Sequence, residues 1–236
     1  MWFLLHPLIS PKKFVHLTNQ LLPWAILFFL ILLIYGMVGG LWLAPPDEVQ
    51  GEGFRIIYVH VPCAFLSLFV YVMMALAAGV GLVFQLKMGF LVVRHSVSMG
   101  ALFAFLALLT GSVWGKPMWG AWWMWDGRLT SELILLFLYI GIMLFQSATL
   151  HKRNGDRATA ILVLIGLVDI PIIHYSVTWW NTLHQGSTLN VFKASSMDAS
   201  MLYPLLAMIA ALMLYYAILL SIRLRRVLLV TQDATI

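Results

Sequence analysis

Charge and cysteine are both scarce in this sequence. Of its 236 residues only 10% are charged and 62% are hydrophobic, and a single residue is a cysteine. Together with a mean hydropathy of +0.95, this composition excludes an ordinary soluble domain and predicts an integral membrane protein. The formal net charge of +5 indicates basic loops on one side of a lipid bilayer rather than binding to nucleic acid.

Several familiar motifs are also missing. The lone Cys63 cannot form an internal disulfide, and no C-x-x-C-H pattern is present for covalent attachment of c-type haem. The nearest approach to a phosphate-binding loop, Gly111 to Lys116, has the wrong glycine spacing and is followed by a proline. Any ATP-driven step would therefore need another subunit. The opening MWFLLHPLISPKKF has no basic segment before its apolar run and no small-residue cleavage site, so we expect an interfacial anchor rather than a cleaved signal peptide.

Six apolar stretches are long enough to cross a bilayer, because a helical crossing needs about 20 apolar residues. They lie at about 21–43, 57–84, 95–113, 129–150, 158–180 and 199–222. The sequence therefore predicts an all-α integral membrane protein with six transmembrane helices in a single domain, residues 1–236. An even number of crossings places both termini on the same side of the membrane.

Basic residues predict which side that is. The N-terminal region, the 85–95 loop, the 151–157 loop and the C-terminal tail carry ten: Lys12, Lys13, Lys87, Arg94, Lys152, Arg153, Arg157, Arg223, Arg225 and Arg226. The other three loops carry four: Arg55, Lys116, Arg128 and Lys193. The excess places both termini in the cytoplasm and the loops at about 44–56, 114–128 and 181–198 outside. In a bacterium with two membranes, outside means the periplasm.

The outer loop between the third and fourth crossings is rich in tryptophan. Its sequence from Trp114 to Arg128 is WGKPMWGAWWMWDGR, with indoles at Trp114, Trp119, Trp122, Trp123 and Trp125. We expect its interspersed glycines and proline to break any regular helix, leaving an irregular platform. Indole rings offer broad apolar faces with one N–H donor each, so such a platform suits a large planar ligand with polar edges.

Membrane proteins more often use tryptophan as an anchor, and an anchoring belt occupies both interfaces. Here the distribution is uneven. Only Trp2 and Trp24 fall at the inner ends of the predicted crossings, whereas eight fall at the outer ends: the five of the loop with Trp42, Trp179 and Trp180. The imbalance favours a ligand platform on the outer face.

Two of the seven histidines, His60 and His184, fall on that same face. We expect His60 at or just above the start of the second crossing, because Pro62 suits a first helical turn. Two imidazoles from separate crossings beside an indole platform favour a pair of axial ligands for the iron of a non-covalently bound b-type haem. Zinc fits less well, because a zinc site normally takes three or four protein ligands.

Haem propionates would need cationic partners on this face. Arg55 and Arg128 are the first candidates, ahead of Lys116 and Lys193, because a guanidinium can hold a carboxylate through two parallel hydrogen bonds. Asp126 directly precedes the fourth crossing. It could cap that helix or contact the ligand, and the sequence leaves both roles open.

The fifth crossing contains Asp169, Pro171 and His174. Ionisable residues at membrane depth are costly and usually face the bundle interior or a wet cavity. We identify Asp169 and His174 as the only deep ionisable residues. We expect a mutually satisfied network of these two residues and the backbone at a proline kink, in preference to metal ligation.

The segment WGKPMWGAWWMWDGRLT closely resembles the tryptophan-rich signature of a family of haem-handling membrane proteins. With His60 before it and WWNTLHQGST around His184, the resemblance narrows to the haem exporter C family of the bacterial cytochrome c maturation system. It covers nearly the whole chain, including DIPIIHYSVTWWNTLHQG. Larger relatives with additional crossings share the loop, but this chain is too short to resemble them throughout.

The resemblance implies a haem site on the periplasmic face of the bacterial inner membrane, with His60 and His184 as axial ligands. It implies delivery of haem to a membrane-anchored periplasmic haem chaperone, beside a two-component ABC transporter and a small single-span helper protein. It implies a delivery scaffold rather than a classical enzyme. Two other hypotheses stay open: a membrane oxidoreductase that passes electrons through b-type haem, and a permease that moves haem through the helix bundle.

Overall fold

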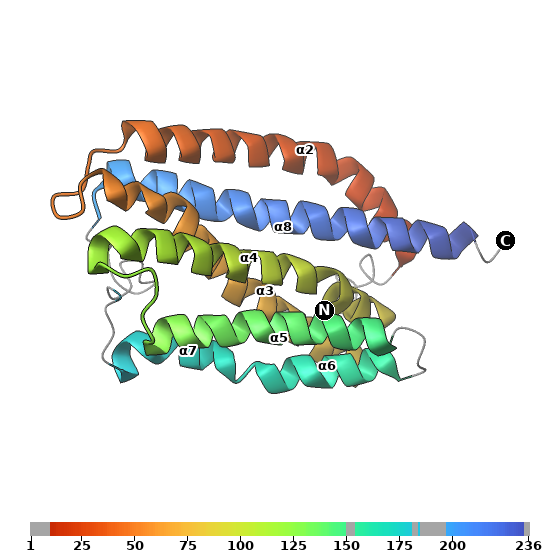
Figure 1. Cartoon of the computed structure of the whole chain (residues 1–236). Coiled ribbons are helices and arrows are strands. Elements are labelled where there is room, and N and C mark those ends of the chain that lie inside the picture. Colours follow the sequence, from red (N-terminus) through yellow and green to blue (C-terminus); the bar gives the residue numbers. More distant parts are fainter. Residues whose placement is uncertain (1–9, 150–153, 181–183, 185–196, 234–236) are drawn as a thin grey trace.

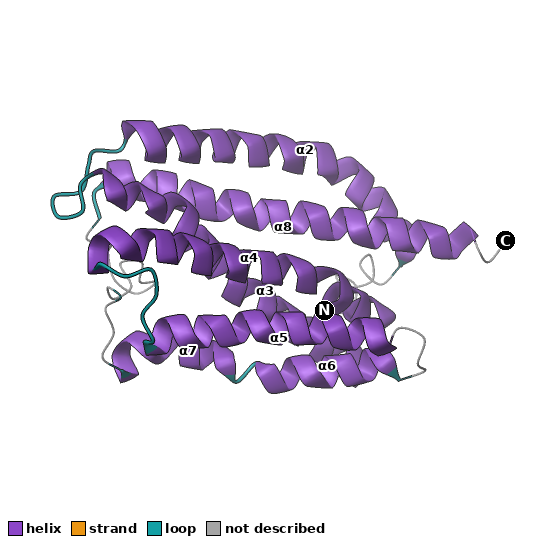
Figure 2. Ribbon diagram, viewed as in Figure 1, coloured by secondary structure: helices purple, strands orange, loops and turns teal. Residues whose placement is uncertain are grey.

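The computed structural model describes residues 10–149, 154–180, 184 and 197–233, and the structural statements below refer to these residues. Long helices run side by side along one axis (Figure 1), and no strand occurs in the described ranges (Figure 2). The α-helices are α2 (Pro11–Val38), α3 (Ile57–Phe84), α4 (Lys87–Trp119), α5 (Gly127–Thr149), α6 (Gly155–Gly166), α7 (Asp169–Trp179) and α8 (Ala199–Asp233).

Two short helical segments adjoin this bundle. The π-helical η1 (Gly39–Leu43) extends α2, and the 3₁₀ helix η2 (Glu52–Ile56) leads directly into α3. Six segments are long and apolar enough to cross a membrane, with α6 and α7 together forming one of them. This confirms the six predicted crossings and the all-α fold.

The core of the bundle lies where α3, α4 and α5 meet. Tyr71 of α3 and Tyr139 of α5 pack edge to face, with ring centroids 5.2 Å apart. A Cβ atom on Gly100 of α4 would lie 2.2 Å from the ring of Tyr139, so the absence of a side chain allows α4 to approach α5. Small residues at helix contacts are typical of membrane proteins, in which close packing rather than burial from water holds helices together.

α2 lies at the edge of the bundle beside α8 (Figure 1). Only 6% of its most apolar 18-residue window is buried within the protein. Its remaining surface is apolar, with exposed residues such as Leu21, Phe28 and Ile31. A helix with this exposed apolar surface requires lipid or another protein around it.

The predicted loop at 85–95 is wrong. α4 begins at Lys87, and a tight connection at Gln85 and Leu86 replaces the loop, with Gln85 in the left-handed region at φ 53°. Arg94 therefore lies on α4, where its guanidinium pairs with Asp156 at 2.7 Å. Long basic side chains can keep their charge in a polar environment while their apolar stems lie along a helix, which is why basic residues do not mark a helix boundary here.

The fifth crossing is interrupted rather than continuous. α6 ends at Gly166 and α7 begins at Asp169. Pro171 lacks an N–H, and its ring would clash with the carbonyl of Leu167 in an uninterrupted helix. The N–H of Ile170 instead bonds to the Leu167 carbonyl at 3.2 Å. The sequence predicts the kink, and the structure places it before the proline.

The predicted network between Asp169 and His174 is not formed. Asp169 is buried, whereas His174 is exposed and packs against the ring of Tyr175. The two residues lie on different faces of α7, because five positions along a helix do not bring side chains together. A third deep ionisable residue, Glu132 of α5, is buried, which corrects the expectation that Asp169 and His174 are alone.

The ends of the helices gather the candidate site residues. Figure 1 shows the start of α3, the end of α4, the start of α5 and the end of α7 at one end of the bundle. The first residues of α2 and the last of α8 lie toward the opposite end. His60, the tryptophan-rich segment and His184 therefore share one end of the bundle, as the predicted topology requires.

Candidate functional site

His60 lies within the first turn of α3 rather than above it. η2 supplies an earlier start to the helical segment, so that Pro62 is inside α3. The Nδ1 atom of His60 is 3.0 Å from the carbonyl oxygen of Ala107 and 3.1 Å from the hydroxyl oxygen of Thr110. A carbonyl only accepts, so Nδ1 carries the hydrogen and donates it. Nε2 is then the nitrogen with the lone pair.

The first part of the tryptophan-rich segment is helical, which corrects the expectation of an irregular platform from Trp114 onward. α4 continues through Gly115 and Pro117 to Trp119. Pro117 lies in the last turn, so the helical hydrogen bond that it removes is followed by only two more helical residues before α4 ends. The helix stops at Gly120, whose φ of 77° suits a glycine at a helix C-terminus.

Trp114 links His60 to the loop between η1 and η2. Its ring meets that of His60 edge to face, with centroids 5.6 Å apart. Its Nε1 donates to the side-chain oxygen of Gln50 at 2.9 Å. The indole is therefore held at both its apolar and its polar end.

The non-helical part of the segment runs from Gly120 to Asp126. Trp122 and Trp125 are exposed, and Trp123 packs edge to face on Trp125 with centroids 5.4 Å apart. The Nε1 atom of Trp123 is buried and has no hydrogen-bond partner among the described residues. A buried N–H in this state has a donor to offer.

Asp126 connects the start of α5 to His184. One carboxylate oxygen accepts the backbone N–H of Leu129 at 2.7 Å, which is the capping role, one of the two roles that the sequence leaves open. The other is 3.2 Å from Nδ1 of His184. On its other side, the ring of His184 meets that of Trp119 with centroids 5.0 Å apart.

The environment keeps His184 neutral. Burial lowers the pKa of its imidazole below the usual value, the hydrogen bond and charge of Asp126 oppose this shift, and the charge of Arg128 adds to it. A pKa below 6.5 leaves the ring uncharged at neutral pH. Neutral imidazole is the form that binds metals.

The two candidate arginines have different surroundings. Arg128 donates to the backbone carbonyl of Ile173 at 3.1 Å, and its charge acts on both His60 and His184. Arg55 donates to the carbonyl of Gly40 at 2.9 Å and pairs with Glu52. Arg128 therefore lies within electrostatic range of both histidines, whereas Arg55 is held at the junction between η1 and η2.

The contacts of Lys116, the third candidate cation, lie within the tryptophan-rich segment. Lys116 donates to the carbonyl of Gly120 at 3.0 Å, and its charge lies 6.0 Å from the ring centre of Trp122. Lys193 lies outside the described residues.

Trp180 lies against Gly127, where a Cβ atom would be 3.1 Å from the indole.

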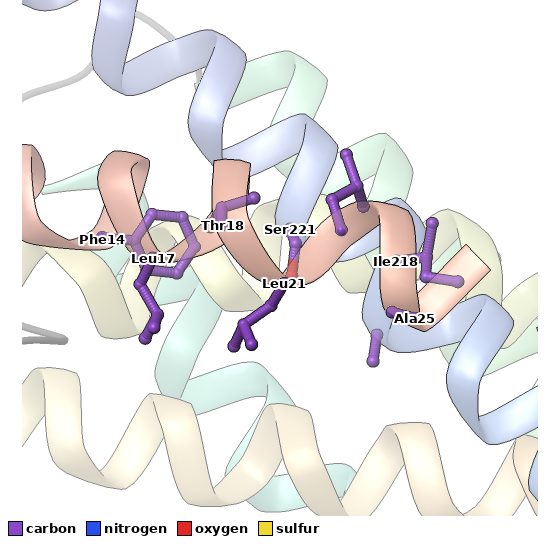
Figure 3. Close-up of a pocket in the computed structure, with 9 residues that line it drawn as sticks. Phe14, Leu17, Thr18, Leu21, Ala25, Ile218 and Ser221 are labelled. Carbon is purple, nitrogen blue, oxygen red and sulfur yellow. The ribbon is translucent and has the colours of Figure 1, made fainter. Parts of the chain in front are cut away.

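Two apolar hollows lie away from these residues. One of about 260 Å³ lies between α2 and α8 (Figure 3), lined by Phe14, Leu17, Thr18, Leu21, Leu22, Ala25, Ala217, Ile218 and Ser221. The other, of about 430 Å³, lies along α2 and η1. Neither is lined by a histidine or a tryptophan. The described residues also contain no group of three or more His, Cys, Asp or Glu that could hold a metal ion.

Four residues that contact the candidate site residues or act on Arg128 were not predicted from the sequence: Gln50, Ala107, Thr110 and Glu132. Thr110 and Trp114 are one helical turn apart on α4, and both contact His60. The sequence would have indicated that they share a helix face if the third crossing had been extended past residue 113. A single acidic residue in the fourth crossing was the available signal for Glu132. Nothing in the sequence indicates that a carbonyl of α4 accepts from His60.

A helical membrane protein with six crossings, carrying two histidines among tryptophans at one end of the bundle, is the class that fold and site define. The model of the family described as heme exporter protein C matches residues 4–235, and the chain belongs to this family.

Three relatives match this chain over nearly the whole length of both proteins. Heme exporter protein C of Escherichia coli is 47% identical over 232 residues, which cover 98% of this chain and 94% of that protein. The protein of the same name from Haemophilus influenzae is 46% identical over 234 residues, covering 99% and 95%. A putative cytochrome c biosynthesis ccmC-like mitochondrial protein of Marchantia polymorpha is 40% identical over 223 residues, covering 94% and 95%.

Proposed function

We propose that this protein binds b-type haem non-covalently through His60 and His184 and delivers it to a membrane-anchored periplasmic haem chaperone during cytochrome c maturation. The relatives are named for heme export and for cytochrome c biosynthesis, which supports haem as the ligand. The observation that carries the proposal is the shared surroundings of the two imidazoles. Each has its Nδ1 against an oxygen acceptor.

This arrangement is the one that metal-binding histidines use. A ligating imidazole usually donates its second N–H to a carbonyl or carboxylate, which fixes the tautomer and the orientation of the ring. The Ala107 carbonyl would do this for His60, and the Asp126 carboxylate for His184. Both rings would then present Nε2 as the ligating atom.

The surroundings of the histidines also suit a porphyrin. Gly111 lies beside His60, and a Cβ atom there would approach the ring to 3.0 Å. Trp114 and Trp119 pack on the two histidines, and the buried Nε1 of Trp123 is a donor for a polar group at the ligand edge. When bound, haem would supply the iron that the imidazoles ligate and the porphyrin that is passed on.

Arg128 is the better placed partner for a haem propionate, because its charge acts on both histidines. Arg55 is assigned a second such role, which would require its guanidinium to exchange the contact with Glu52 for the ligand. The basic-residue distribution supports a periplasmic site in the inner membrane. The ABC transporter and the single-span helper are the remaining proposed partners.

The other two hypotheses receive different support. A membrane oxidoreductase would need a deeper haem, and the described residues place the exposed His174 beside Tyr175 with no second histidine paired to it. A permease is favoured only by the buried carboxyls Glu132 and Asp169. Haem delivery uses more of the observed geometry than either alternative.

The test is an optical spectrum of the purified protein, repeated for His60→Ala and His184→Ala. Each variant should lose most of its haem and fail to load the chaperone, while still inserting in the membrane. His16→Ala is the matched control, because His16 is exposed on α2 at the far end of the bundle. Normal haem content and loading in both site variants would reject the axial assignment.

A further inference from the structure

A second buried polar cluster lies inside the bundle. It consists of Tyr71 of α3, Glu132 of α5 and Asp169 of α7, whose exposed fractions are 0%, 5% and 8%. The charge of Asp169 acts on both Tyr71 and Glu132. Three ionisable side chains from three helices therefore lie within electrostatic range of one another inside the bundle.

Their hydrogen bonds are unequal. Glu132 accepts from the hydroxyl of Ser67 at 2.7 Å. Oδ2 of Asp169 and the hydroxyl of Tyr71 are both buried and have no hydrogen-bond partner among the described residues. Leaving a buried polar atom unsatisfied costs about 1–3 kcal/mol, so these two atoms, which lie within electrostatic range of each other, are available to a small bound species.

The hydroxyl of Tyr71 reaches the break between α6 and α7. A Cβ atom on Gly166 would lie 2.1 Å from this oxygen, so only a glycine admits it. In a continuous helix the Gly166 carbonyl would accept the N–H of Ile170, but that N–H bonds to Leu167 instead. An acidic side chain, a hydroxyl and a backbone carbonyl without its helical partner thus meet at one interruption of a membrane crossing.

We propose that the break between α6 and α7 binds one small monovalent cation, a proton or a sodium ion, held by Asp169 and the Tyr71 hydroxyl. Interrupted membrane helices hold such cations through carboxylates and unwound carbonyls. The cation neutralises one of two carboxyls that lie near each other at membrane depth, where uncompensated charge is costly.

Occupancy of this site also bears on the histidine site without depending on it. Arg128 donates to the carbonyl of Ile173, which lies one helical turn beyond Asp169 on α7. A cation that stabilises the start of α7 therefore also fixes the position of the carbonyl that accepts from Arg128. The titratable groups on which the charge of Asp169 acts are Tyr71 from α3 and Glu132 from α5, and Glu132 in turn interacts with Arg128 and Tyr139 of α5.

The experiment measures the thermal unfolding midpoint of the full-length protein in detergent, with no haem added. Sodium is titrated against choline at constant ionic strength and pH, and pH is then varied in choline alone. The midpoint of the wild-type protein should rise by on the order of 3 °C for each tenfold increase in cation above its dissociation constant. A rise with sodium identifies sodium, and a rise only with falling pH identifies a proton.

Variants assign the response to Asp169. Asp169→Asn removes the charge at nearly constant volume and should show no response to the cation that stabilises the wild-type protein. His174→Asn, an exposed ionisable position on the same helix, should respond as the wild type does. Glu132→Gln, which can still accept from Ser67, should keep the response but require a higher cation concentration, because the neighbouring negative charge is removed. A response that persists in Asp169→Asn, or that is lost only in Glu132→Gln, overturns the proposal.

Tyr71→Phe keeps the proposal testable if Asp169→Asn does not fold. This change retains the ring packed on Tyr139 and removes only the hydroxyl. The cation concentration needed for half the response should rise at least about tenfold, the equivalent of one lost ligand. An unchanged titration in Tyr71→Phe, or a wild-type midpoint insensitive to both cations, shows that the site does not exist.

Discussion

Asp126 lies 3.2 Å from Nδ1 of His184 while its second carboxylate oxygen caps α5. One side chain therefore fixes both the start of a membrane helix and the orientation of a candidate ligand. The two functions can be separated, because the cap needs one acceptor oxygen and the contact with His184 needs the other.

Asp126→Asn should separate them. Asparagine caps helices as well as aspartate does, but its one oxygen cannot also accept from His184. We expect a thermal midpoint close to that of the wild type and haem affinity lower by about 10- to 100-fold, as for other lost supports of metal-bound histidine. Haem titration followed by absorbance measures the affinity. Asp126→Ala should lose both thermal stability and haem affinity. An Asp126→Asn variant that binds haem as tightly as the wild type would contradict the role assigned to the contact with His184.

Haem binding should persist somewhat below pH 6.5 and fail at lower pH. Burial and the charge of Arg128 lower the pKa of His184, so protons compete with iron for this ring only in more acidic solution. Asp126 opposes the shift, so Asp126→Asn should lower the pKa further: its affinity at neutral pH is lower, but the pH at which that affinity falls to half its own neutral-pH value moves down. The pH dependence of the bound haem spectrum tests this order, and movement to higher pH would be inconsistent with it.

Replacement of Trp119 should reveal how much the ring supports His184. Trp119→Ala removes an aromatic contact at 5.0 Å, a class of interaction worth about 0.5–1.5 kcal/mol. Haem affinity should fall by roughly 2- to 12-fold. Trp119→Phe keeps an aromatic ring and should retain most of the affinity in the same titration. If alanine and phenylalanine give the same loss, the indole itself contacts the ligand.

Gly100 should tolerate no side chain. Gly100→Ala would drive a methyl group into the buried ring of Tyr139, where a Cβ would lie 2.2 Å away, and overpacking of this kind costs about 1–3 kcal/mol. Gly141→Ala on α5 is the control, because no neighbouring atom lies within 4 Å of its added Cβ. Thermal unfolding in detergent should show a lower midpoint for the first variant and an unchanged or higher one for the second. Similar midpoints would mean that α4 can move away from α5.

The six crossings could be read from the sequence because the bilayer imposes a minimum apolar length on every helix. The same rule sets no maximum length. α4 begins at Lys87 and ends at Trp119, beyond the apolar run in both directions, because basic and aromatic residues at a membrane surface are compatible with helix. The helical part of the tryptophan-rich segment was missed for this reason.

The candidate ligands could also be chosen from the sequence, since His60, His184 and the tryptophans follow from residue type and predicted side. Their supports could not. The acceptors of His60 come from α4 and lie 47 and 50 positions further along the chain, and the acceptor of His184 is the residue directly before α5, 58 positions before the histidine. Contacts between helices depend on helix rotation and depth, which apolar composition does not specify because every lipid-facing position accepts the same residues.

The sequence by itself determined the membrane class, the number of crossings and the family signature, and it predicts the two candidate histidines. Only the tertiary structure decided which nitrogen of each histidine faces an oxygen acceptor, and that Asp169 lies within electrostatic range of Tyr71 while His174 packs on Tyr175. The physical reason is that hydrophobicity acts on each segment separately, whereas hydrogen-bond partners at membrane depth are selected by the packing of all segments together.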